Sequence, residues 1–213
     1  MPEFPSKSAV WNVPQGQLIV RSFCGSEEIA ALRFPDSFKK FASYQPIISS
    51  LKRLVGAAAK PGANVVIVHE PGNDIVGVGV MEPPPSGERW HRVGDDVMLE
   101  VSVIEVSREW RSGGVARKLL SLLMDHPNIE DRIVYMVGYS WTWDLDGVGK
   151  TAMEYRNILM NLFARFQFKP YPTNEPNVCL RPENLFMARI GARVSPEVQR
   201  KFKWVRFNLD LHT

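Results

Sequence analysis

A short polar turn followed by two glycines is the part of the sequence whose residue types most directly suggest chemistry. Arg111 and Ser112 form the turn, and Gly113 and Gly114 lead into an apolar helical segment. The start of a helix leaves backbone N–H groups without partners and carries a partial positive charge, and glycines let a ligand approach the backbone closely. The segment 111–116 therefore predicts a phosphate or pyrophosphate site, although two glycines can also simply make a tight strand-to-helix connection.

Two carboxylates on the strand before this turn, Glu100 and Glu105, could do acid–base chemistry. Burial raises the pKa of a carboxylate, so that it can accept a proton near neutral pH. Side chains alternate along a strand, so the odd separation of these residues places them on opposite faces, and without a bulge only one of them can face a given substrate. For each residue, a solvated carboxylate with no chemical role is the alternative.

A second glycine-containing segment, 147–151, resembles the end of a nucleotide-binding P-loop. The P-loop needs a glycine five positions before Gly149, where this chain has Asp144, and no apolar strand leads directly into the segment. The sequence therefore argues against a nucleoside triphosphatase.

The apolar pattern around these residues predicts a mixed α/β fold, with antiparallel strands first and alternating strands and helices after them. β-Branched runs at 64–69 and 75–81 flank Pro71 and Gly72, which indicates a hairpin. A Pro-rich polar loop follows at 82–96. The other expected elements are strands at 18–23, 97–106, 132–138, 185–190 and near 204–209, and helices at 27–32, 47–55, 115–124 and 151–166.

Length and composition set the broad class of the protein. A chain of 213 residues with 45% hydrophobic residues can bury a good-sized core, and a net charge of +3 is too small to predict nucleic-acid binding. Cys24 and Cys179 can form at most one bridge, so we expect reduced thiols. The histidines lack ligand spacing, and we expect no metal. The prolines near the N-terminus do not fit a secretory signal, and no stretch has bilayer-spanning length, so we expect a cytoplasmic protein without a membrane partner.

The spacing Arg111-x-x-Gly114-x-Ala116 after an apolar strand resembles the acetyl-CoA motif of the GNAT N-acetyltransferase superfamily. The order of hairpin, long strand, motif, helix, strand and helix is similar as well. The resemblance implies a GNAT fold, a mixed, mostly antiparallel sheet that splays between its two central strands and has helices on both faces. It also implies acetyl-CoA as co-substrate, with backbone amides on the pyrophosphate and a strand edge on the pantetheine arm. The implied cofactor-binding residues are Ile104, Val106, Arg111, Ser112, Gly113, Gly114, Val115 and Ala116.

Blocks at 139–149 and 187–191, with the pair Tyr155 and Arg156, look like blocks of the acetoin-utilization acetyltransferases of the AcuA type. The likeness runs from residue 97 to the end of the chain and is weaker over residues 1–60. It implies a single GNAT domain over residues 1–213 with a divergent N-terminal part. AcuA-type enzymes acetylate an active-site lysine of AMP-forming acetyl-CoA synthetase and switch it off, so the resemblance implies this synthetase as the protein substrate.

The same resemblance assigns roles to the carboxylates. A free lysine has a pKa of about 10.4, so a base must remove its proton before acetylation. Glu100 stands eleven residues before Arg111, the position of the catalytic glutamate in histone-acetylating GNAT enzymes, and it ranks ahead of Glu105 as this base. The backbone N–H of Val106 would stabilise the oxyanion.

The resemblance does not assign the general acid, because Phe163 occupies the place of the tyrosine that many GNAT enzymes use. Tyr139 and Tyr155 are alternatives, and a thiolate can also leave without a proton donor because thiols are fairly acidic.

The predicted substrate-binding residues are Tyr139, Trp141, Trp143 and Asp144. The two tryptophans share a face of an extended segment, where they could pack over pantetheine, against a partner or in the core. Asp144 could orient the lysine or cap the following turn. Two other functions stay open: a small-molecule amine N-acetyltransferase, and a non-catalytic subunit that binds the synthetase in response to acetyl-CoA.

Overall fold

The computed structural model describes residues 4–38 and 44–209. The chain divides into two compact units, and each unit combines separate segments of the chain. The first unit comprises Met1–Glu82 and Val101–His126, and the second comprises Pro83–Glu100 and Pro127–Thr213. Strand β5 (Met98–Val106) therefore contributes residues to both units. A single domain over residues 1–213 stays a prediction.

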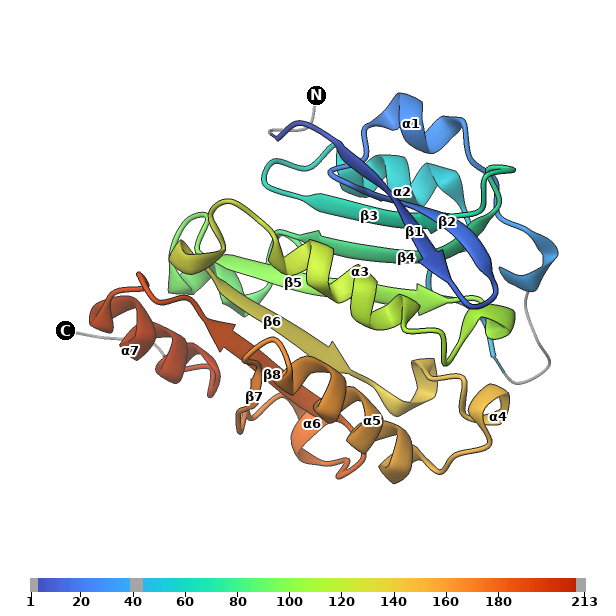
Figure 1. Cartoon of the computed structure of the whole chain (residues 1–213). Coiled ribbons are helices and arrows are strands. Elements are labelled where there is room, and N and C mark those ends of the chain that lie inside the picture. The colour runs from blue at the N-terminus through green and yellow to red at the C-terminus, as the bar shows by residue number, and fades with distance from the viewer. Residues whose placement is uncertain (1–3, 39–43, 210–213) are drawn as a thin grey trace. The chain divides into compact units, whose positions relative to one another are not determined.

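The first unit is built on antiparallel strands (Figure 1). Its strand order is β1 (Lys7–Val13), β2 (Gly16–Ser22), β3 (Asn64–His69), β4 (Ile75–Glu82) and the later part of β5. The predicted hairpin is confirmed, because β3 and β4 pair antiparallel with Asn64 opposite Met81. Every residue of β3 is buried, as expected for an uninterrupted β-branched run.

Three α-helices belong to the first unit within the described residues: α1 (Ser26–Ala30), α2 (Leu51–Ala58) and α3 (Val115–Met124). Helix α3 lies close to β4 because Gly77 and Gly79 have no side chains. A methyl group on Gly77 would come within 2.9 Å of Val115 Cγ1, and one on Gly79 within 3.2 Å of a Leu123 methyl. The two glycines therefore let α3 rest directly on the strand, at its start beside Gly77 and near its end beside Gly79.

The second unit contains a mixed sheet in the order β5, β6 (Ile133–Gly138), β8 (Leu185–Ile190) and β7 (Lys169–Pro170). Strands β5 and β6 run parallel, from Met98 opposite Ile133 to Glu100 opposite Tyr135. Strands β6 and β8 run antiparallel. The predicted mixture of parallel and antiparallel strands is confirmed.

The helices of the second unit include those that pack in its aromatic core. The α-helices of this unit are α4 (Leu145–Val148), α5 (Ala152–Ala164), α6 (Pro176–Cys179) and α7 (Pro196–Val205), with the short 3₁₀ helices η2 (Arg89–Val93), η4 (Ile129–Asp131) and η5 (Ser140–Thr142). The buried Trp90 of η2 stacks on Phe186 of β8, with ring centroids 4.9 Å apart. Tyr135 and Phe202 complete this cluster.

The predicted final strand near 204–209 is wrong, because helix α7 continues to Val205 and residues 206–208 form a turn. The hydroxyl of Ser195 accepts a hydrogen bond from the N–H of Val198 at 3.3 Å, and Pro196 occupies the first helical position. Both are strong helix-start signals, and the helix buries Phe202 and Val205. The predicted loop at 82–96 also contains helix η2, and the helix expected at 47–55 begins only at Leu51.

No helix in the described ranges has the length and hydropathy needed to cross a bilayer.

Candidate active site

The predicted phosphate turn forms a sharp bend in the first unit, between β5 and α3. Two residues have left-handed backbones, Ser112 with φ of 68° and Gly114 with φ of 82°. No atom lies within 4 Å of the position that a side chain on Gly114 would occupy. Glycine adopts this conformation without cost, whereas Ser112 stores backbone strain of the kind found at functional sites.

The start of α3 offers a set of backbone donors. The first hydrogen bond of the helix runs from Lys118 N–H to the carbonyl of Gly114 at 3.0 Å, so the amides of Val115, Ala116 and Arg117 have no partner within the helix. No side chain caps this helix start. Together with the helix dipole, these amides can hold an anion.

Two contacts tie the turn to its surroundings. The Arg111 Nε–H donates to the carbonyl of Val106 at 3.2 Å, which links the turn to the end of β5. Gln15, at the tip of the β1–β2 hairpin, lies beside Gly113, since its side-chain nitrogen would be 3.4 Å from a methyl group there. The structure therefore brings the predicted residues 111–116 together and adds Gln15, which no local sequence pattern indicates.

The later part of β5 carries the other predicted residues of the first unit. Ile104 is half-buried and Val106 is buried. Glu105 is only 6% exposed, and its carboxylate accepts a hydrogen bond from the Tyr44 hydroxyl at 2.5 Å. Sequence reasoning missed Tyr44, because it lies 61 residues earlier in the chain. Glu105 is thus a buried carboxylate with a neighbouring hydroxyl donor.

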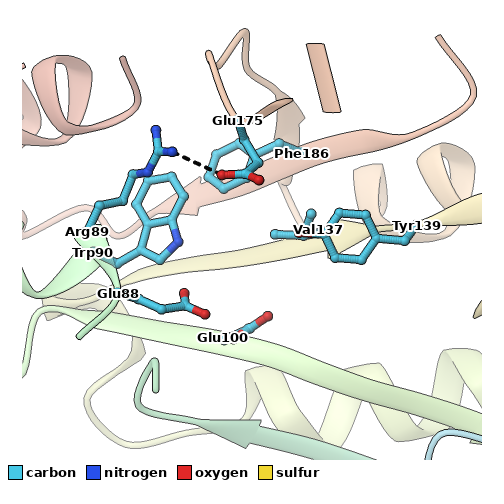
Figure 2. A pocket seen from close by; sticks show the side chains of 8 residues that line it. All are labelled: Glu88, Arg89, Trp90, Glu100, Val137, Tyr139, Glu175 and Phe186. Atoms are coloured by element: carbon cyan, nitrogen blue, oxygen red, sulfur yellow. Dashed lines mark hydrogen bonds and ion pairs between the residues drawn. The ribbon is translucent and has the colours of Figure 1, made fainter. Parts of the chain in front are cut away.

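The second unit contains a pocket of about 350 Å³ (Figure 2). Glu100 and Tyr139, both predicted site residues, line it. Glu100 accepts a hydrogen bond from the Tyr135 hydroxyl at 3.2 Å. The lining residues are Glu88, Arg89, Trp90, Glu100, Val137, Tyr139, Glu175 and Phe186.

The pocket is mainly acidic, with three carboxylates and one guanidinium. Arg89 forms an ion pair with Glu175 at 2.9 Å, drawn as a dashed line in Figure 2. Partial desolvation raises the pKa of Glu88, and the negative charge of Glu175 raises it further. Burial and the same three carboxylates also raise the pKa of Tyr139. These raised pKa values indicate a pocket in which a further negative charge is destabilised and a cation is stabilised.

The aromatic block after β6 divides into an exposed and a buried part. Trp141 is 56% exposed and stacks on Tyr139, with centroids 4.8 Å apart. Trp143 is only 9% exposed and stacks on Tyr155. Asp144 is 2% exposed and caps α4 by accepting the N–H of Gly147 at 3.0 Å. Packing and capping thus occupy Trp143 and Asp144, and the predicted substrate roles of all four residues stay predictions.

The candidates for a general acid differ in their surroundings. Phe163 is buried against Phe168, which accounts for an apolar residue at this position. Tyr155 stacks on Trp143, whereas Tyr139 lines the pocket. The described residues hold no group of three or more metal-ligating side chains, and the absence of a metal stays an expectation.

Comparisons with known proteins place this geometry in context. No protein-family model matches the sequence. The chain is 31% identical over 192 residues to the acetoin utilization protein AcuA of Bacillus subtilis, covering 90% of each chain. The crystal structure of an acetoin utilization protein from Exiguobacterium sibiricum superposes with a TM-score of 0.86 at 27% identity, over 97% of this chain and 96% of that one. Diaminobutyrate acetyltransferase EctA from Paenibacillus lautus, solved with its substrate and coenzyme A, shares the fold with a TM-score of 0.50 at 13% identity, over 80% of this chain and 93% of its own. The predicted GNAT fold is confirmed.

Proposed function

Because the chain belongs to the AcuA family of acetoin utilization proteins, we propose that it is a cytoplasmic lysine N-acetyltransferase that uses acetyl-CoA. We further propose AMP-forming acetyl-CoA synthetase as its protein substrate, which acetylation inactivates. The single observation that carries the proposal is the turn before α3, with its left-handed Gly114 and its amides that lack helical partners. Such a turn fits a pyrophosphate group.

On the cofactor side, the residues of the first unit provide binding and orientation. The amides at the start of α3 would hold the CoA pyrophosphate, and Gly77 lets this helix start pack closely against β4. Ile104 and Val106 would hold the pantetheine arm, and the Val106 N–H would donate to the acetyl carbonyl oxygen. Bound acetyl-CoA supplies the acetyl group as a thioester.

On the acceptor side, the pocket of the second unit suits an amine on an apolar stem. Val137, Phe186 and the ring of Tyr139 supply apolar surface, and the carboxylates supply the negative charge that an ammonium group needs. Glu100, which lines the pocket, would take the ammonium proton. The neutral nitrogen would then form the N–C bond with the acetyl carbonyl, and the C–S bond would break to release the CoA thiolate.

Two observations concern the kind of acceptor and the identity of the catalytic base. Trp141 is exposed beside Tyr139, a pocket residue, and an exposed tryptophan at a pocket favours a protein acceptor over a small amine. Glu105 is the second candidate base, because it is buried and has a hydroxyl neighbour.

The test combines the purified protein, acetyl-CoA and purified acetyl-CoA synthetase, with mass spectrometry of the synthetase lysines and a synthetase activity assay. We expect lysine acetylation and loss of synthetase activity. No labelling of the synthetase alongside acetylation of small amines would overturn the protein substrate. Glu100→Gln and Glu105→Gln identify the base, and equal labelling by wild type and both variants would exclude both carboxylates from that role.

A further inference from the structure

We propose that Glu88 is the specificity-determining residue of the pocket in the second unit, where it binds the ammonium end of a primary-amine acceptor before transfer. This inference rests on the proposed acetyltransferase function and adds a residue that the sequence does not indicate. It also narrows the acceptor to a cation carried on a flexible alkyl stem, such as a lysine side chain.

The three carboxylates of the pocket are not equivalent. Glu175 is paired with Arg89 at 2.9 Å, and Glu100 accepts the Tyr135 hydroxyl at 3.2 Å. Within the described part of the chain, the carboxyl group of Glu88 makes no hydrogen bond and no ion pair, although Arg89 and His91 act on it through longer-range charge. Glu88 is therefore the carboxylate best able to accept a new hydrogen-bond donor.

The electrostatic situation of Glu88 favours a cationic ligand. Partial desolvation of the carboxyl group raises its pKa, and the charge of Glu175 raises it further. A bound ammonium would offset both effects, whereas a neutral or anionic acceptor would offset neither. Figure 2 shows the carboxyl groups of Glu88 and Glu100 turned into the pocket, which the proposed base therefore lines together with Glu88.

The backbone at Glu88 is held in place even though its side chain is solvent-accessible. Its N–H donates to the carbonyl of Pro85 at 3.2 Å, and its carbonyl accepts the N–H of His91 at 3.3 Å. Two residues later, Trp90 is anchored in the aromatic core by its stacking on Phe186. An anchored backbone limits the backbone entropy that is lost when the side chain binds a ligand.

The apolar part of the lining supports the same class of acceptor. Trp90, Val137, Tyr139 and Phe186 give the pocket an apolar and aromatic wall beside its carboxylates. Burying methylene groups against such surfaces stabilises the bound state, and an ammonium group is attracted to aromatic faces. A lysine side chain has both features.

The experiment measures binding of Nα-acetyl-lysine amide and of its uncharged norleucine counterpart to the full-length protein by calorimetry. We expect wild type to prefer the lysine probe, Glu88→Gln to bind it roughly tenfold more weakly, and Glu88→Asp to retain most of the affinity. The matched control is Glu197→Gln, which removes an exposed carboxylate that pairs with Lys201 on α7. It should behave as wild type.

Steady-state acetylation of the synthetase provides the second readout. Glu88→Gln should raise KM by about tenfold with kcat unchanged, because Glu88 acts on the charged ground state and not on the neutral nitrogen. An unchanged KM, an unchanged lysine preference in this variant, or no lysine preference in wild type would each overturn the role of Glu88. If wild type prefers the lysine probe but transfers no acetyl group to any amine, the proposed function fails and the role of Glu88 in cation binding stands.

Discussion

Replacing Gly114 by alanine tests the conformation of the turn before α3. Gly114 has φ of 82°, and no atom lies within 4 Å of the new methyl group, so the cost is conformational and not steric. A left-handed backbone costs an alanine roughly 1–2 kcal/mol. In a protein of this size, each kcal/mol lowers Tm by about 2–4 °C, so we expect Gly114→Ala to lower Tm by about 2–8 °C.

Two neighbouring substitutions serve as controls for that measurement. A methyl group on Gly113 meets Gln15 only at ordinary contact distance, so Gly113→Ala should change stability by less than about 0.5 kcal/mol. Gly149, the C-cap of α4, is left-handed with φ of 61° and open space around it. Gly149→Ala should therefore lose about as much stability as Gly114→Ala.

Urea unfolding measures the stability of each variant, and calorimetry with CoA measures its affinity for the cofactor, so the two effects can be told apart. Gly114→Ala should weaken CoA binding by about fivefold to thirtyfold, if the strain of about 1–2 kcal/mol displaces the amides. Gly149→Ala should leave CoA affinity unchanged. Equal stability of Gly113→Ala and Gly114→Ala would refute the backbone argument, and equal loss of CoA affinity in Gly114→Ala and Gly149→Ala would refute the role of the turn.

Three further predictions concern stability. Gly191→Ala should destabilise the protein by about 2–4 kcal/mol in urea unfolding, because the new methyl group would lie 2.3 Å from the carbonyl oxygen of Glu130, and a backbone atom cannot move aside as a flexible side chain can. A loss of less than about 1 kcal/mol would contradict this close contact. Tyr44→Phe should cost about 1–3 kcal/mol, since it leaves the buried Glu105 without its hydroxyl donor, and wild-type stability would show that the hydrogen bond contributes nothing. The backbone N–H of Ala192 and the guanidinium of Arg189 hold the pKa of Glu130 below its usual 4.5. The stability that the ionised Glu130 contributes to the folded protein is therefore complete above pH 4.5, and it is lost as the pH falls through the lower pKa of the folded state. Stability measured from pH 7 to 3 should thus fall less steeply in Glu130→Gln, and identical slopes would exclude this linkage.

The elements that the sequence predicts well carry their signal within a few residues. Strand β3 was predicted with its observed bounds because its β-branched run is buried throughout, and α3 because an apolar helical period follows Gly114 directly. Strand β1 was missed because most of its residues are exposed, so it lacks a buried face that alternates along the sequence. The strand near 204–209 was wrong because the helix-start signals lie upstream, at Ser195 and Pro196.

The candidate site also contains residues that the sequence predicts and residues that it does not. The phosphate turn is contiguous in the sequence, so its residue types and spacing predict it. The contact between Tyr44 and Glu105 and the ion pair between Arg89 and Glu175 join residues far apart in the chain, and no local pattern encodes either. Glu88 went unnoticed for the same reason, because its significance depends on the charge of a residue on another loop.

The charges of the two subsites have a consequence for the order in which ligands arrive. A phosphate group that entered the pocket of the second unit would meet three carboxylates against one guanidinium, and an ammonium group at the start of α3 would meet the positive end of a helix dipole. Under the proposed function, each region would thus repel the ligand of the other. Neither the thioester nor the amine would be attracted to the place of the other, so we expect a productive complex to form whichever of them arrives first.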